Sequence, residues 1–285
     1  MPAAGTVLVT GATGKTGRHL VPQLLDAGTD VRAMVRNPVT AQLPAGVDVV
    51  RGDLTEPDTL HAALDGVDSV FLLWPMFSAE GAPAVVDAIA RHARRVVYLS
   101  AMADAGGARP DGFWGRIEEL IEAAGLEWTF LRAGGFAGNT FGWAEQIRTE
   151  GVVRWPYGAA ARSLIHEADI AAVAAATLTT DGHAGRSYAL TGPEAVTQAE
   201  QVRIIGEAVG RTVRWDEPTP AEAREMLLSQ WGDSGYVDAA LDAWAAMVER
   251  PEPVTTAVQD VTGRPARTFR QWAVDHADTF RSRPA

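Results

Sequence analysis

The sequence predicts an α/β protein built on a doubly wound parallel sheet, with a smaller C-terminal α/β part. Two observations predict it. Over the first 140 residues, short segments that are apolar throughout alternate with segments of helical pattern, and such strands are buried on both faces of a parallel sheet. The first apolar segment also leads into a glycine-rich turn at residues 11–17, as in many doubly wound sheets. We therefore expect one domain at residues 1–140 and a second part, interleaved with it, at residues 141–285.

The predicted strands of the first half are short and are bounded by residues that end them. Thr6–Thr10 is rich in β-branched residues and lies between two glycines. The helix predicted over residues 14–27 has a leucine face and ends before Gly28. Further strands are predicted at residues 30–36, 47–51, 69–74, 96–100 and 127–131, with helices at residues 56–64, 82–92 and 115–124.

The second half has a looser pattern. Strands are predicted at residues 152–155 and 187–191, and helices at residues 167–177, 198–209, 220–228, 236–248 and 268–280. Three aromatic residues of this half, Trp231, Tyr236 and Trp244, either form a lid or pack a small helical core.

Composition excludes several classes of function. The net charge is −11, which disfavours general binding to nucleic acid or to an anionic membrane. The chain contains no cysteine, so disulfides, thiolate metal sites and a cysteine nucleophile are excluded. No apolar run approaches the roughly 20 residues of a membrane helix, and the histidines show no metal-ligand spacing. We expect a cytoplasmic protein with no metal site, and the oligomeric state stays open.

The glycine-rich turn is the most informative motif. Gly11, Gly14 and Gly17 follow the first strand and open the first helix. In this context the first glycine permits a tight turn, the second lets the backbone approach a pyrophosphate, and the third lets helix and strand pack closely. The spacing differs from that of a P-loop. We expect a dinucleotide to contact Gly11, Thr13, Gly14, Lys15, Thr16 and Gly17, the alternative being a turn without a ligand.

The residue after the second strand decides which dinucleotide is bound. An acidic residue there would hold a ribose 2′-hydroxyl, but the chain has Arg36. A guanidinium matches a phosphate bidentately, and Lys15 adds a second positive charge. The sequence therefore predicts NADPH rather than NADH, unless Arg36 is only a solvated charge.

Ligands of doubly wound sheets bind beyond the carboxyl ends of the strands. Asp53 and Leu54 follow the third strand, where they either contact the adenine or, in the case of Asp53, cap the next turn. By the same rule, further cofactor contacts are expected from Leu73, Trp74, Pro75, Ser100, Ala101, Ala133, Gly134 and Phe136.

These motifs resemble the NmrA-like, atypical branch of the short-chain dehydrogenase/reductase family. The resemblance covers nearly the whole chain and rests on residues 11–17, 35–38, 52–54, 117–118, 125–132, 136–139, 166–171, 188–194 and 261–265. It implies a Rossmann fold, an NADP-type cofactor and a small C-terminal substrate-binding part. Relatives in this branch include quinone reductases, ketone or alkene reductases, and redox-sensing regulators.

The sequence departs from the superfamily where the chemistry is expected. Most relatives of the wider superfamily use a Tyr-x-x-x-Lys pair, in which the tyrosine protonates the carbonyl oxygen. Counting back from Glu118, the lysine position holds Trp114 and the tyrosine position holds Pro110. Ser100 occupies the place of the catalytic serine. We expect it either to bind a substrate oxygen or only to satisfy the loop backbone.

Aromatic residues near the predicted strand ends indicate an apolar pocket. Substrate contacts are expected from Phe77, Trp114, Phe136, Asn139, Phe141, Trp143 and Tyr157. Flat aromatic molecules would stack there, and quinones need little acid catalysis. The predicted function is an NADPH-dependent reductase of a quinone, or of an aromatic or polycyclic ketone or enone. The alternative is a non-catalytic sensor of NADP(H) that binds a protein partner.

Overall fold

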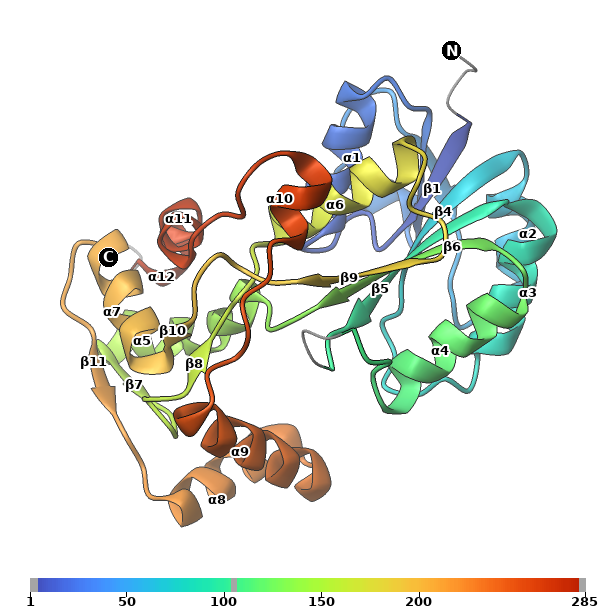
Figure 1. Ribbon diagram of the computed structural model, residues 1–285. Coiled ribbons are helices and arrows are strands. Elements are labelled where there is room, and N and C mark those ends of the chain that lie inside the picture. Colours follow the sequence, from blue (N-terminus) through green and yellow to red (C-terminus); the bar gives the residue numbers. More distant parts are fainter. Residues whose placement is uncertain (1–4, 104–106, 282–285) are drawn as a thin grey trace. The chain divides into compact units, whose positions relative to one another are not determined.

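The computed structural model describes residues 5–103 and 107–281 (Figure 1). The chain forms two compact units that interleave along the sequence. The first unit consists of Met1–Gly134, Glu167–Leu190 and Thr255–Pro265, and the second consists of Gly135–His166, Thr191–Val254 and Ala266–Ala285. The first unit therefore takes one strand and two helices from beyond residue 140.

The first unit is built on a seven-stranded sheet with the order β3-β2-β1-β4-β5-β6-β9, in which every neighbouring pair is parallel. The strands are β1 (Thr6–Thr10), β2 (Val31–Val35), β3 (Asp48–Arg51), β4 (Val67–Leu73), β5 (Arg95–Ala101), β6 (Glu127–Ala133) and β9 (Arg186–Leu190). The strand order reverses between β1 and β4, which is where such sheets bind their ligands. The predicted fold class is confirmed.

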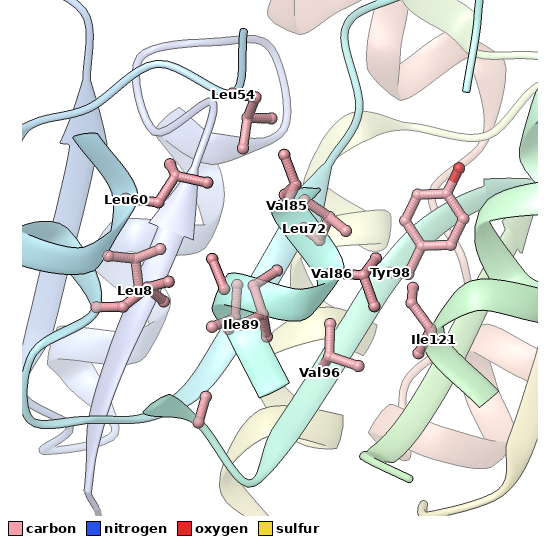
Figure 2. Close-up of a cluster of buried hydrophobic side chains, with 14 of the residues drawn as sticks. Leu8, Leu54, Leu60, Leu72, Val85, Val86, Ile89, Val96, Tyr98 and Ile121 are labelled. Atoms are coloured by element: carbon pink, nitrogen blue, oxygen red, sulfur yellow. The ribbon is translucent and has the colours of Figure 1, made fainter. Parts of the chain in front are cut away.

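Helices cover the sheet of the first unit on both faces. One face carries α2 (Leu60–Leu64), α3 (Ala82–His92) and α4 (Gly112–Ala123), while α1 (Gly17–Asp26) packs with α6 (Glu167–Thr179) on the other. The last helix of the unit, α10 (Ala257–Thr262), packs on α6 and β9. Figure 2 shows the apolar core between the sheet and the first group of helices, with Leu8, Leu72, Val85, Ile89 and Tyr98 among its members.

The second unit contains two small sheets and several helices. Its strands pair as β7 (Val152–Arg154) with β11 (Arg214–Asp216), and β8 (Ala161–Arg162) with β10 (Val196–Thr197). Its helices are α5 (Ala144–Glu150), α7 (Gln198–Ala208), α8 (Pro220–Trp231), α9 (Ser234–Glu249), α11 (Phe269–Asp275) and α12 (Ala277–Phe280). Capping boxes begin α8 and α11, where Thr219 pairs with Glu222 and Thr268 with Gln271.

The structure corrects several predicted elements. The first helix begins at Gly17 rather than at residue 14, because residues 11–16 form the turn. The single helix predicted at residues 268–280 is two helices that meet at His276. The helix predicted at residues 56–64 begins as the 3-10 helix η2 (Pro57–Thr59) and continues as α2. Elements that the prediction lacked are the 3-10 helices η1 (Pro38–Thr40) and η3 (Ala137–Trp143), the helices α5 and α10, and the short strands β8, β10 and β11.

Among the described residues, no helix is both long and apolar enough to cross a membrane.

Candidate functional site

The glycine-rich turn closes tightly between β1 and α1. Gly11 has a φ of +62° and accepts a hydrogen bond from the Gly14 N–H at 2.9 Å. A Cβ at Gly17 would lie 2.2 Å from the Gly11 carbonyl oxygen and 2.6 Å from the Ala12 Cα. A Cβ at Gly14 would lie 3.1 Å from the same oxygen. Only glycine fits at position 17, so the first turn of α1 sits directly against the end of β1.

This turn is suited to a dinucleotide phosphate. The first helical N–H groups of α1 point out of its N-terminus, where the helix dipole favours negative charge. Thr13 and Lys15 are exposed beside it, whereas Thr16 is buried. The glycines leave the backbone without side chains that would block its approach to the phosphates. The residues present therefore fit a dinucleotide, as the sequence predicted.

A hydrogen bond holds the end of β4 against the turn. The Thr10 hydroxyl accepts from the Leu73 N–H at 2.7 Å, and the Leu73 side chain lies 3.5 Å from the position of a Cβ on Gly11. Of the other predicted contacts here, Pro75 is exposed. Trp74 is largely buried in the apolar core and donates its indole N–H to the Ser78 carbonyl.

The ends of β2 and β3 carry the charged groups of the candidate site. Arg36 is exposed directly after β2. One carboxylate oxygen of Asp53 accepts from the Thr55 backbone N–H at 2.9 Å and from the Thr55 hydroxyl at 2.8 Å. These bonds, with the nearby charges of Arg36 and Arg51, lower the pKa of Asp53. Asp53 therefore caps its own turn, and Leu54 is buried in the core.

The predicted cofactor contacts at the ends of β5 and β6 lie side by side on paired strands. Ala101 pairs with Ala133, and the Ala133 carbonyl accepts from the Met102 N–H at 2.9 Å. Gly134 continues β6 and donates its N–H to the Leu190 carbonyl at 2.9 Å.

Ser100 belongs to a buried polar network. It is 3% exposed and donates its hydroxyl proton to Glu118 of α4 at 2.7 Å. Glu118 is fully buried and receives two bonds from the Arg132 guanidinium, at 2.9 Å and 2.7 Å. Arg132 also donates to the Gly107 carbonyl. A buried carboxylate needs such partners, and here β5, α4 and β6 each supply one member.

Tyr98 lies close to this network but is unsuited to acid catalysis. Its side chain is fully buried, and its hydroxyl has no hydrogen-bond partner among the described residues. Burial and the charge of Glu118 raise the pKa of Tyr98 far above its usual value. The hydroxyl therefore keeps its proton.

Aromatic side chains gather on the surface of the first unit where α4 begins. The rings of Phe113 and Trp114 have centroids 4.0 Å apart, and Phe77 meets Phe113 edge-to-face at 6.4 Å. Phe77 is 87% exposed and Trp114 is 36% exposed. The structure thus brings together two of the predicted substrate contacts through Phe113.

The remaining predicted substrate contacts lie in the second unit. Trp143 is buried and packs against Trp155 and Trp215, and Phe141 packs against Trp272. Asn139 is exposed and donates its backbone N–H to Phe136, which is partly buried.

Tyr157 in the second unit has a left-handed backbone conformation. Its φ is +57°, a conformation that bulky residues rarely adopt. The Glu217 carboxylate holds it there by accepting the N–H groups of Tyr157 and Gly158, at 3.1 Å and 2.9 Å. Trp231 and Trp244 pack around the core of α8 and α9 with Tyr157 at its edge.

The described residues contain no group of three or more histidine, aspartate or glutamate side chains that could hold a metal ion.

Residues 11–181 match the model of a family described as NAD(P)H-binding. The chain belongs to this family. Along its whole length it is also similar to two reductases. The first is the (4-alkanoyl-5-oxo-2,5-dihydrofuran-3-yl)methyl phosphate reductase of Streptomyces griseus, with 38% identity over 96% of this chain and 99% of the relative. The second is the NAD(P)H azoreductase of Xenophilus azovorans, with 36% identity over 96% and 99%.

Solved structures share the fold. An NADPH-dependent quinone oxidoreductase of Escherichia coli, complexed with NADPH, superposes with a TM-score of 0.78 at 23% identity, over 94% of this chain and 99% of the other. A triphenylmethane reductase of Citrobacter sp., complexed with NADP(H), gives 0.78 at 22% identity, over 95% and 99%. The NAD(P)H-binding family and the Rossmann-like fold inferred from the sequence are both confirmed.

Proposed function

We propose that this protein is an NADPH-dependent reductase that transfers hydride to a quinone, or to an aromatic or polycyclic ketone or enone, without a Tyr-Lys pair. The observation that carries the proposal is the glycine turn with Arg36 exposed at the end of the neighbouring strand. The Streptomyces griseus and Xenophilus azovorans relatives, which match over 96% of this chain and are both named as reductases, support a reductase over a sensor.

The cofactor contacts follow from the first unit. Gly11, Gly14 and Gly17 leave the backbone open to the pyrophosphate, and the N-terminus of α1 favours its charge. Arg36 binds the 2′-phosphate, since a guanidinium pairs with two phosphate oxygens at once. Asp53 keeps its charge because its pKa is lowered, and its second oxygen accepts from the adenine amine.

The chemistry needs little from the protein beyond orientation. NADPH, when bound, supplies the hydride, and a proton from solvent completes the reduction of the acceptor. Counted back from Glu118, Pro110 stands in place of the tyrosine and Trp114 in place of the lysine of a Tyr-Lys pair. Tyr98 is too deeply buried to donate a proton. A quinone suits such a site, because its reduced oxygen is stable as a phenolate and takes its proton from water.

Ser100 is the proposed catalytic residue. Its proton points to Glu118, so its oxygen accepts a hydrogen bond more readily than it donates one. In this orientation Ser100 binds a hydroxyl of the reduced product. Ser100→Ala is expected to lower turnover and to leave NADPH binding intact, and unchanged turnover would remove Ser100 from the mechanism.

The substrate is proposed to be flat and aromatic. Phe77, Phe113 and Trp114 form a partly exposed cluster of tilted and edge-on rings, and exposed aromatic clusters often mark binding sites. Phe136, Asn139, Phe141, Trp143 and Tyr157 remain proposed contacts from the second unit.

Calorimetric titration with NADPH and NADH tests the cofactor assignment. Arg36→Ala is expected to weaken the binding of NADPH by about 1.5–3 kcal/mol, the value of a charge-assisted hydrogen bond, and to leave the binding of NADH unchanged. Arg91→Ala is the matched control, because Arg91 is an exposed arginine on α3 that pairs with Asp87. Equal losses of affinity for both cofactors in the Arg36 variant would contradict the assignment.

NADPH oxidation with a panel of quinones, ketones and enones then tests turnover. Tight binding of NADPH with no oxidation across the panel would favour the sensor.

A further inference from the structure

A second arginine stands beside Arg36 at the same edge of the sheet. In the β2–β3 pair, Val35 lies opposite Arg51, and the Gly52 N–H donates to the Val35 carbonyl at 3.0 Å. Arg36 follows Val35 directly, so the two arginines leave the sheet from neighbouring strands at their carboxyl ends. Both are exposed.

Asp53 lies in the same turn region and is influenced by both guanidinium charges. Asp53 follows β3 by two residues, and the charges of Arg36 and Arg51 both lower its pKa, after the stronger effect of its two bonds to Thr55. Two exposed cations, one from each of two neighbouring strands, therefore lie near the end of this edge of the sheet.

The present partner of Arg51 is a weak one. A guanidinium nitrogen lies 3.5 Å from a carboxylate oxygen of Glu56, and both side chains are more than half exposed. Exposed pairs of this kind contribute little to stability. Arg51 can therefore exchange Glu56 for a stronger anion at small cost.

We propose that Arg51 is a second ligand of the NADPH 2′-phosphate and forms a two-arginine clamp with Arg36. The proposal rests on the proposed NADPH preference. A dianionic phosphate has oxygens enough for more than one guanidinium. Arg51 brings a second guanidinium to it from the neighbouring strand once it leaves Glu56.

The test uses two nucleotides that differ only in the 2′-phosphate, 2′,5′-ADP and 5′-AMP, titrated calorimetrically into the full-length protein. Arg51→Gln is expected to weaken 2′,5′-ADP by about tenfold to a hundredfold, the range of a charge-assisted hydrogen bond, and to change 5′-AMP less than twofold. Arg51→Lys keeps the charge without the planar guanidinium, and its affinity for 2′,5′-ADP should lie between those of the wild type and Arg51→Gln. Arg91→Gln on α3 is the matched control and should leave both affinities unchanged.

A salt series gives a second readout. For wild-type protein and Arg51→Gln, the affinity for 2′,5′-ADP is measured at rising ionic strength. Loss of one phosphate contact should make the salt dependence of the variant shallower. Equal slopes, or equal weakening of 2′,5′-ADP and 5′-AMP, would overturn the clamp, since Arg51 would then act on the adenine or on the fold.

Failure of the clamp is distinguishable from failure of the NADPH assignment. If Arg36→Gln removes the preference for 2′,5′-ADP and Arg51→Gln does not, only the clamp is wrong. If the wild-type protein binds the two nucleotides equally, the NADPH assignment is wrong and the clamp fails with it.

Discussion

The buried Glu118–Arg132 pair should be a major determinant of stability in the first unit. Glu118→Ala removes a carboxylate that is fully buried and holds two bonds from Arg132 and one from Ser100. The Arg132 side chain is 7% exposed, so its charge would be left buried, with the Gly107 carbonyl as its remaining hydrogen-bond partner among the described residues. Breaking a buried pair from one side costs about 3–5 kcal/mol, and we expect the free energy of unfolding to fall by that amount.

Urea denaturation followed by tryptophan fluorescence measures this change. Glu119→Ala is the matched control, since Glu119 is the next residue of α4 and pairs with Arg116 at 2.8 Å on the surface. Its loss should cost less than about 1 kcal/mol. Replacing both members of the buried pair, as Glu118→Leu with Arg132→Met, should recover most of the stability. Similar small losses for Glu118→Ala and Glu119→Ala would refute the reasoning.

Three further outcomes follow from single sites. Gly17→Ala should lower stability by about 1–3 kcal/mol and weaken NADPH, because its Cβ would meet the backbone of the turn; Gly81→Ala, where the nearest atom is 3.9 Å away, should change neither, and equal melting temperatures would contradict this. Burial, with the charges of Arg95 and Arg186, lowers the pKa of His183 below 6.5. The unfolded chain therefore binds the proton more readily, and stability should fall as the pH drops through about 6.5. His183→Gln should flatten that part of the melting-temperature profile, and an identical profile would argue against it. Phe77→Ala should leave the melting temperature unchanged, since Phe77 is 87% exposed, but should raise KM for aromatic acceptors in the NADPH-oxidation assay; an unchanged KM would remove Phe77 from the substrate contacts.

The core of the fold could be predicted from the sequence because its signals are local. The helix at residues 82–92 was predicted with both of its observed ends, since Pro83 marks its first turn and apolar residues line one face. The strand Thr6–Thr10 was predicted with equal accuracy because glycines flank it. Such boundaries depend on backbone preferences that neighbouring residues already reveal.

Elements with no local period were missed. Residues 137–150 contain two aromatic residues, Phe141 and Trp143, without the spacing of an amphipathic helix. They form η3 and α5 because these rings pack into the core of the second unit. The short strands β8 and β10 are two residues long, and pairing with a distant segment alone defines them. The sequence carries no signal for such a pairing.

The side chains of the candidate site also divide into features that the local sequence predicts and features that depend on distant segments. Arg132 closes an apolar strand, and a charge in such a strand signals a buried partner, but only the structure identifies that partner as Glu118. Ser100 is predicted as a site residue from its place at the end of a strand, and it stays a prediction. The orientation of its hydroxyl could not be predicted, because the direction of its hydrogen bond depends on the Glu118 carboxylate of α4. The direction of this bond matters for the chemistry. A serine that donates its proton to a carboxylate can accept a hydrogen bond from a ligand, but it cannot also donate one to a carbonyl group of the substrate. A reductase with this arrangement needs an acceptor that is reactive without acid assistance, and among the predicted substrates a quinone meets that requirement best.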